Sequence, residues 1–249
     1  MKFFFNKSEV YSPKFFLYQY NDNSFRVVLQ KSCRGKGFEE INKQTSFIPQ
    51  TESDEIQRIS LSRTKRNIRE LALCNGFTHF ATLTVNSDKA DRFSLQECQD
   101  LLKYKIKEKI RRKNKDFAYL FITEKHKNGA FHFHGLVKNL DFYINDNGYL
   151  SNKVFDEIGF NSFSEIRDFE KTCNYITKYI TKDCVKNENN QIYICSRGLK
   201  KADKYEINSI SIDKWGFENE FCKIKDFNVN EMNSDELLQF MSIREKRGL

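Results

Sequence analysis

A chain of 249 residues with 39% hydrophobic and 14% aromatic side chains can bury a substantial core, which excludes a globally disordered protein. Its formal net charge of +8 favours an anionic partner such as nucleic acid. No apolar run approaches the roughly 20 residues that a membrane-spanning helix needs, and the seven cysteines include no CxxC pair. We therefore expect a cytoplasmic protein with reduced thiols and no membrane association.

The first sixty residues contain two short strand-like segments, FFLYQY and FRVVLQ, followed by a polar stretch without a clear pattern. A basic helix is expected over 60–76, because apolar residues recur there at helical spacing. The following segment FTHFATLTVN, residues 77–86, predicts a strand rich in β-branched and aromatic residues. Thr82 and Thr84 share one face of that strand, and we expect this face to contact DNA.

Ser94 and Glu97 have the spacing of a capping box, which predicts the start of a helix. Residues 117–125 and 131–137 then predict two strands joined by a turn at HKNGA. The order of strand, helix and hairpin predicts an α+β protein with a mostly antiparallel sheet and helices on one face.

Two of the four histidines, His132 and His134, alternate with phenylalanines on the second hairpin strand. Both imidazoles then point to one side of the sheet and could bind a metal ion. A three-residue hairpin loop places Glu124 opposite His132 as an oxygen ligand, whereas a two-residue loop turns Glu124 to the other side. His126 has the same parity as Glu124 and is the competing third ligand; we prefer Glu124.

A helix beginning near Asp168 carries two stripes of side chains. The apolar stripe comprises Phe169, Cys173, Ile176, Ile180 and Cys184. The second stripe, rotated by roughly 100°, comprises Tyr175, Lys178, Tyr179 and Lys182. A phenol with a pKa of about 10 attacks poorly at neutral pH unless nearby positive charge favours the phenolate. The lysines could supply that charge; alternatively, the tyrosines flank the core and the lysines are solvated.

These motifs resemble a known family. HFHGLV is similar to the histidine–hydrophobic–histidine motif of the HUH endonucleases. YITKYITK, residues 175–182, resembles the Y-x-x-K-Y-x-x-K signature of their two-tyrosine rolling-circle replication initiators, which occur in small phages and plasmids. FATLTVN resembles the strand motif that precedes both, and the motif order also fits. The resemblance extends over residues 60–185.

The resemblance implies the ferredoxin-like nuclease fold of HUH replication initiators. We expect one domain over 1–249 with a catalytic core at 60–205. The flanking segments 1–60 and 205–249 would be elaborations whose role the resemblance does not indicate.

By the same resemblance, Tyr175 and Tyr179 would be nucleophiles and Lys178 a helper, while His132 and His134 would bind Mg²⁺ or Mn²⁺. The expected activity is site-specific nicking and rejoining of single-stranded or cruciform origin DNA through a 5′-phosphotyrosine, with a host polymerase and helicase as further partners. The candidate DNA contacts are Thr82, Thr84, Lys182, Arg197 and Lys200.

Two other functions compete with this interpretation. A non-catalytic nucleic-acid-binding α+β module, with aromatic side chains as stacking platforms, explains the charge and the phenylalanines but not the paired histidines. An HUH strand transferase of transposition or conjugation fits less well, because the tyrosine number and the motif order differ.

Overall fold

The computed structural model describes residues 14–21, 24–30, 50–178, 180, 192–207 and 222–228. The chain divides into two compact units, one formed by residues 48–200 and the other by residues 1–47 together with 201–249. The domain organisation expected from the sequence stays a prediction.

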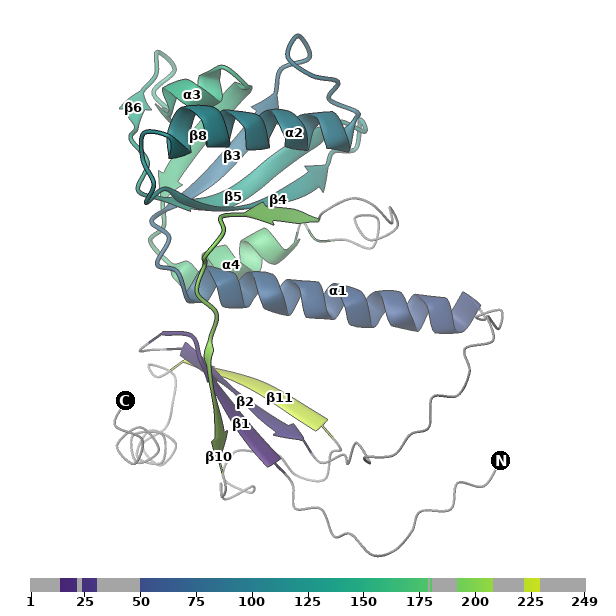
Figure 1. The fold of residues 1–249 in the computed structure, drawn as a ribbon. Coiled ribbons are helices and arrows are strands. Elements are labelled where there is room, and N and C mark those ends of the chain that lie inside the picture. Colours follow the sequence, from purple (N-terminus) through teal and green to yellow (C-terminus); the bar gives the residue numbers. More distant parts are fainter. Residues whose placement is uncertain are drawn as a thin grey trace, which may run out of the picture. The chain divides into compact units, whose positions relative to one another are not determined.

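The larger unit contains a seven-stranded antiparallel sheet of order β6-β7-β8-β3-β5-β4-β9 (Figure 1). Its strands are β3 (His79–Val85), β4 (Ala118–Lys125), β5 (Phe131–Lys138), β6 (Tyr143–Ile144), β7 (Leu150–Ser151), β8 (Gly159–Glu165) and β9 (Tyr193–Cys195). The expected α+β class with an antiparallel sheet is confirmed.

Helices lie on both faces of this sheet, which differs from the expectation of one face. They are α1 (Gln50–Leu73), α2 (Leu95–Lys105), the π-helix η1 (Ile106–Arg111), α3 (Lys153–Asp156) and α4 (Phe169–Lys178). Helices α2 and α3 cover one face, and α1 and α4 lie side by side at the other (Figure 1). Among the described residues, none of these helices has the length and apolar character needed to cross a bilayer.

The core under α2 follows from the alternation of β3 and β5. Ala81 and Leu83 of β3 and Phe133 of β5 are fully buried there against Cys98 and Leu102 of α2. The phenylalanines that alternate with the two histidines therefore face this core. Both imidazoles point to the opposite face, as the sequence predicts.

The π-helix keeps the apolar stripe of α2 directed at the sheet. Cys98, Leu102, Ile106 and Ile110 are all buried and recur every four residues. Four residues turn an α-helix by about 400°, so such a stripe would advance about 40° per step. The wider π turn rotates less per residue and offsets that drift. It therefore also fixes the direction of Arg111, the last residue of η1.

The N-terminus of α2 is capped as expected in one direction only. Ser94 Oγ accepts a hydrogen bond from the backbone N of Glu97 at 3.4 Å. The Glu97 carboxylate, however, accepts from the backbone N of Asp91 and not from that of Ser94. The cap still satisfies one of the unpaired N–H groups of the first turn.

The β4–β5 hairpin has the three-residue loop on which the Glu124 prediction depended. His126 and Ala130 form the last backbone pair, and the N of Gly129 donates to the carbonyl of His126 at 2.8 Å. Gly129 has φ +90°, the left-handed conformation that closes this type of loop. Glu124 is consequently paired with His132.

The smaller unit is a four-stranded antiparallel sheet of order β10-β1-β2-β11. Its strands are β1 (Lys14–Gln19), β2 (Ser24–Gln30), β10 (Asp203–Ile207) and β11 (Cys222–Asn228). The two strands expected near the N-terminus are confirmed. They pair with strands from the other end of the sequence.

Candidate active site

A cluster of three histidines and one carboxylate lies at the hairpin. Nε2 of His134 is 2.8 Å from Oε2 of Glu124. The ring of His126 stacks on that of His132, with centroids 4.2 Å apart. Both candidate third ligands are thus next to a histidine of the HxH motif, Glu124 beside His134 and His126 beside His132.

Thr82 and Thr84 fix the other side of the two imidazoles. Each threonine of β3 lies directly opposite one histidine of β5. The hydroxyl of Thr84 is 2.9 Å from Nδ1 of His132, and that of Thr82 is 3.4 Å from Nδ1 of His134. These contacts orient both rings with Nε2 directed away from β3. The predicted DNA contact of the two threonines stays a prediction.

The electrostatics of the cluster favour neutral imidazoles. Burial lowers the pKa of His132, and the neighbouring His126 and Arg92 lower it further. Burial also lowers the pKa of His134, against the raising effect of its hydrogen bond to Glu124. A neutral imidazole is the form that binds a metal ion.

Arg92 is a site residue that the sequence did not indicate. Its charge acts on His132, and its carbonyl accepts a hydrogen bond from the backbone N of Phe131 at 2.8 Å. Among the described residues, Nε of Arg92 is buried without a hydrogen-bond partner. A buried, unsatisfied guanidinium nitrogen beside the cluster could bind an anionic ligand.

Tyr175 lies on the same sheet face as the cluster. Its ring packs edge-on against Phe80 of β3, with centroids 5.5 Å apart, and Phe80 in turn stacks on His134 at 5.8 Å. The Tyr175 side chain is 44% exposed, so its hydroxyl is accessible to a substrate. The ammonium group of Lys178 is 6.0 Å from the Tyr175 ring. One phenylalanine therefore links the candidate nucleophile to the histidine strand.

Helix α4 is held in place by contacts to α1. Arg69 donates to Glu170 at 2.7 Å and to Asn174 at 3.0 Å. The predicted apolar stripe is confirmed where it is described: Cys173, Ile176 and Ile180 are buried. Burial raises the pKa of the Cys173 thiol to about 12. Tyr179 and Lys182 lie outside the described residues.

Exposed aromatic rings continue the face beside the histidines. Cross-strand pairing forms a row composed of Glu124, His132, Thr84 and Phe160, on β4, β5, β3 and β8. Phe160 is 49% exposed and packs edge-on against Tyr149, which is 48% exposed. Because strands are spaced by about 4.8 Å, Phe160 is roughly 10 Å from His132 along the row.

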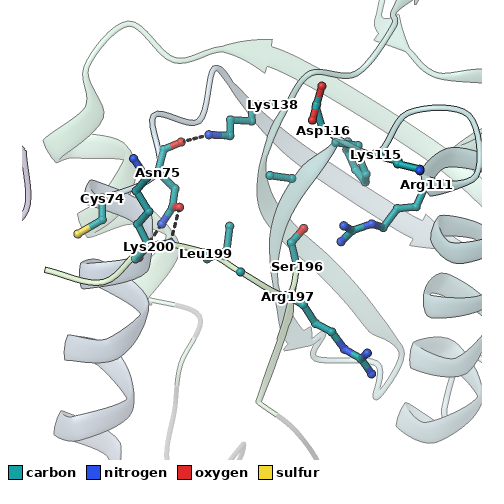
Figure 2. A pocket seen from close by; sticks show the side chains of 13 residues that line it. Cys74, Asn75, Arg111, Lys115, Asp116, Lys138, Ser196, Arg197, Leu199 and Lys200 are labelled. Carbon is teal, nitrogen blue, oxygen red and sulfur yellow. Dashed lines mark hydrogen bonds between the residues drawn. The ribbon is translucent and has the colours of Figure 1, made fainter.

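Arg197 and Lys200 lie at a different place. They line a cavity of about 430 Å³ at the start of β4 and the end of β5 (Figure 2). Glu124 is six residues further along β4, or roughly 20 Å at strand spacing. The structure therefore does not bring these two residues together with the histidine cluster.

The donor chemistry of the cluster fits a divalent cation. Two imidazoles and a carboxylate share one face, and Mg²⁺ or Mn²⁺ prefers oxygen ligands. Among the described residues, no three side chains of the metal-binding types already surround a common point. The Glu124–His134 hydrogen bond would have to open for a cation to bind there.

Comparison with known proteins agrees with this arrangement of site and fold. An antiparallel α+β sheet with paired histidines on one strand and a tyrosine helix beside them defines a class of candidate DNA-processing proteins. Residues 78–184 match a family model described as Replication-associated protein, of the ORF2 type. The matched segment contains β3, the histidine strand and α4. The resemblance to replication initiators is thereby confirmed at the level of this family, which indicates a role in replication. No curated protein and no solved structure matches the chain.

Proposed function

We propose that this protein initiates rolling-circle DNA replication by nicking and rejoining one strand through a covalent phosphotyrosine. The observation that carries the proposal is the ring sequence Tyr175–Phe80–His134 on one sheet face. It brings a candidate nucleophile next to a candidate metal site. The family match supports the replication role.

His132, His134 and Glu124 would hold Mg²⁺ or Mn²⁺, with His126 as the competing ligand. A bound divalent ion polarises a phosphodiester and offsets the negative charge that develops on it during attack. Thr82 and Thr84 keep the imidazoles oriented. Arg92, with its unpartnered Nε, would bind an oxygen of the scissile phosphate.

In the nicking step, the phenolate oxygen of Tyr175 attacks phosphorus and the P–O3′ bond breaks. The phenolic proton passes to solvent, and the leaving 3′-oxygen takes a proton from water. The products are a 5′-phosphotyrosine and a free 3′-OH, which a host polymerase can extend behind a host helicase. Because one phosphodiester replaces another, no ATP is required. Tyr179, four residues further along the sequence, would cut the regenerated site while a 3′-OH resolves the first linkage.

The bases next to the scissile phosphate would lie along the sheet face. Phe160 and Tyr149 offer exposed rings on which an unpaired base can stack. Lys182 would contact a phosphate from the tyrosine helix. Single-stranded or extruded origin DNA fits this face because its bases are free to stack.

The decisive experiment incubates the purified chain with labelled single-stranded origin DNA and Mn²⁺ or Mg²⁺, and then separates the products on a denaturing gel. We expect a covalent protein–DNA adduct that EDTA prevents. Tyr175→Phe with Tyr179→Phe should abolish the adduct. Tyr104→Phe is the matched control, because Tyr104 is an exposed tyrosine of α2, on the opposite face of the sheet.

Different results would favour the other functions. An adduct that persists in the double variant rules out these nucleophiles. DNA binding without cleavage at any metal concentration indicates a non-catalytic binding module. Cleavage that requires two donor ends, with transfer between them as the main product, would indicate a transposition or conjugation enzyme.

A further inference from the structure

The cavity at the far end of the hairpin is strongly basic. Five basic side chains and a single carboxylate line it: Arg111, Lys115, Lys138, Arg197 and Lys200, with Asp116. Among the described residues, no carboxylate pairs with Arg111 or Arg197. Figure 2 shows Arg111 extending from the helix toward the wall that carries Ser196 and Arg197. We call this cavity the basic pocket.

The loop that carries Arg197 and Lys200 is fixed in place. The buried side chain of Asn75, just after α1, donates to the carbonyl of Lys200 at 2.9 Å and accepts from its N at 2.8 Å. Ser196 Oγ accepts from the backbone N of Tyr119 at 2.9 Å, and the N of Ser196 donates to the Tyr119 carbonyl at 3.0 Å. The pocket wall is therefore preorganised, which reduces the entropy lost on binding.

Two guanidinium groups converge near one phenol of this wall. Burial raises the pKa of Tyr119, and the charges of Arg111 and Arg197 both oppose that rise. Arg111 owes its direction to η1, and a π turn inside a helix often marks a functional site. Two unpaired arginines beside each other repel unless an anion lies between them.

We propose that the basic pocket binds phosphate groups of the origin DNA backbone, roughly 20 Å from the scissile phosphate. At about 3.4 Å per nucleotide of a stacked strand, this separation corresponds to about six nucleotides. The pocket is a second anchor, which sets the register of the strand on the catalytic face. The inference rests on the proposed function for the identity of the DNA.

The test compares Arg111→Gln with Arg197→Gln, singly and together, against Arg112→Gln. Arg112 is the adjacent residue, is exposed, pairs with Glu108 and does not line the pocket, so its variant removes the same charge. Binding of labelled origin oligonucleotides is measured by fluorescence anisotropy in EDTA over a series of salt concentrations. The double pocket variant should bind roughly tenfold more weakly. Its salt slope should fall by about 0.7 to 0.9 for each phosphate lost.

Oligonucleotide length and a free nucleotide identify the source of the phosphate. The ratio of wild-type to variant affinity should shrink when the DNA ends about three nucleotides from the nick. Equal salt slopes for the pocket variants and Arg112→Gln overturn the proposal. Thermal stabilisation of the wild type by ATP, lost in the pocket variants while their DNA slopes stay unchanged, would overturn the DNA assignment in favour of a free nucleotide.

This proposal and the proposed function can fail separately. If the wild type forms the metal-dependent adduct but the pocket variants bind like Arg112→Gln, only the pocket assignment is wrong. If the pocket variants lose salt-dependent binding but no adduct forms with wild-type protein, the pocket assignment holds and the nicking activity is wrong.

Discussion

The hydroxyl of Thr84 is a small group with a large expected effect, because it fixes the tautomer and direction of His132. We expect Thr84→Val, which keeps the side-chain volume, to weaken Mn²⁺ binding by about 10- to 100-fold. Metal titration of the cleavage reaction and calorimetry both measure this loss, and excess Mn²⁺ should rescue cleavage.

Thr78→Val is the control for that substitution. Thr78 contacts Nδ1 of His79, a threonine–histidine pair outside the cluster. Unchanged Mn²⁺ affinity in Thr84→Val, or an equal loss in both variants, would remove Thr84 from the metal site.

Gly135, which follows the second histidine of the motif, has a packing role. A Cβ at this position would lie 2.2 Å from Cδ1 of Phe121, a fully buried ring. We expect Gly135→Ala to destabilise the protein by about 1 to 3 kcal/mol through overpacking. Urea unfolding measures the change. Phe121→Leu should recover part of it in a double-mutant cycle, and additive effects would contradict the steric account.

At the scale of single elements, α4 works only if α1 holds it against the histidine face. Arg69 binds both Glu170 and Asn174 of α4. Such a partly exposed pair contributes little to stability, about 0 to 1 kcal/mol. A small displacement of a nucleophile can nevertheless slow a reaction by about 100-fold. Arg69→Ala should therefore slow adduct formation far more than it lowers the unfolding midpoint.

Single-turnover kinetics with denaturant unfolding distinguish these two effects. Arg63→Ala, in an exposed position of the same helix, should leave the rate unchanged. A rate loss in Arg69→Ala that merely parallels the loss of folded protein would indicate a structural role alone.

The β8 edge of the sheet should bind bases through Phe160. Stacking on an exposed ring contributes about 1 to 3 kcal/mol per base. Phe160→Ala should thus weaken single-stranded DNA binding by about 5- to 150-fold, whereas Phe160→Tyr should retain it. Anisotropy measures both, with Tyr104→Ala as the control for loss of an exposed ring elsewhere. Equal affinities for the Ala and Tyr variants would exclude stacking.

At the scale of the whole molecule, every described site residue and the family match lie in the unit of residues 48–200. We expect a fragment of these residues to form the metal-dependent adduct with origin DNA. Circular dichroism monitors its folding and denaturing gels its activity. A folded fragment that forms no adduct would show that the strands at the chain ends take part in catalysis.

Local sequence patterns predicted the elements of the candidate site well. Alternation at 131–134 placed both imidazoles on one face, and the position of Gly129 matched the loop that pairs Glu124 with His132. The apolar stripe of α4 was also predictable, because it depends on helical periodicity alone. By contrast, β8 contains serine, asparagine and glutamate and has no such pattern, so Phe160 was missed.

The sequence by itself determined which residue types lie together along each strand and helix, because side-chain direction repeats every 2 or 3.6 residues. Only the tertiary structure decided what lies between elements: the threonines opposite the histidines, Phe80 between Tyr175 and His134, and Asn75 locked to Lys200. Those contacts follow from strand order and helix placement. Because they arise from the packing of distant segments, no local spacing encodes them.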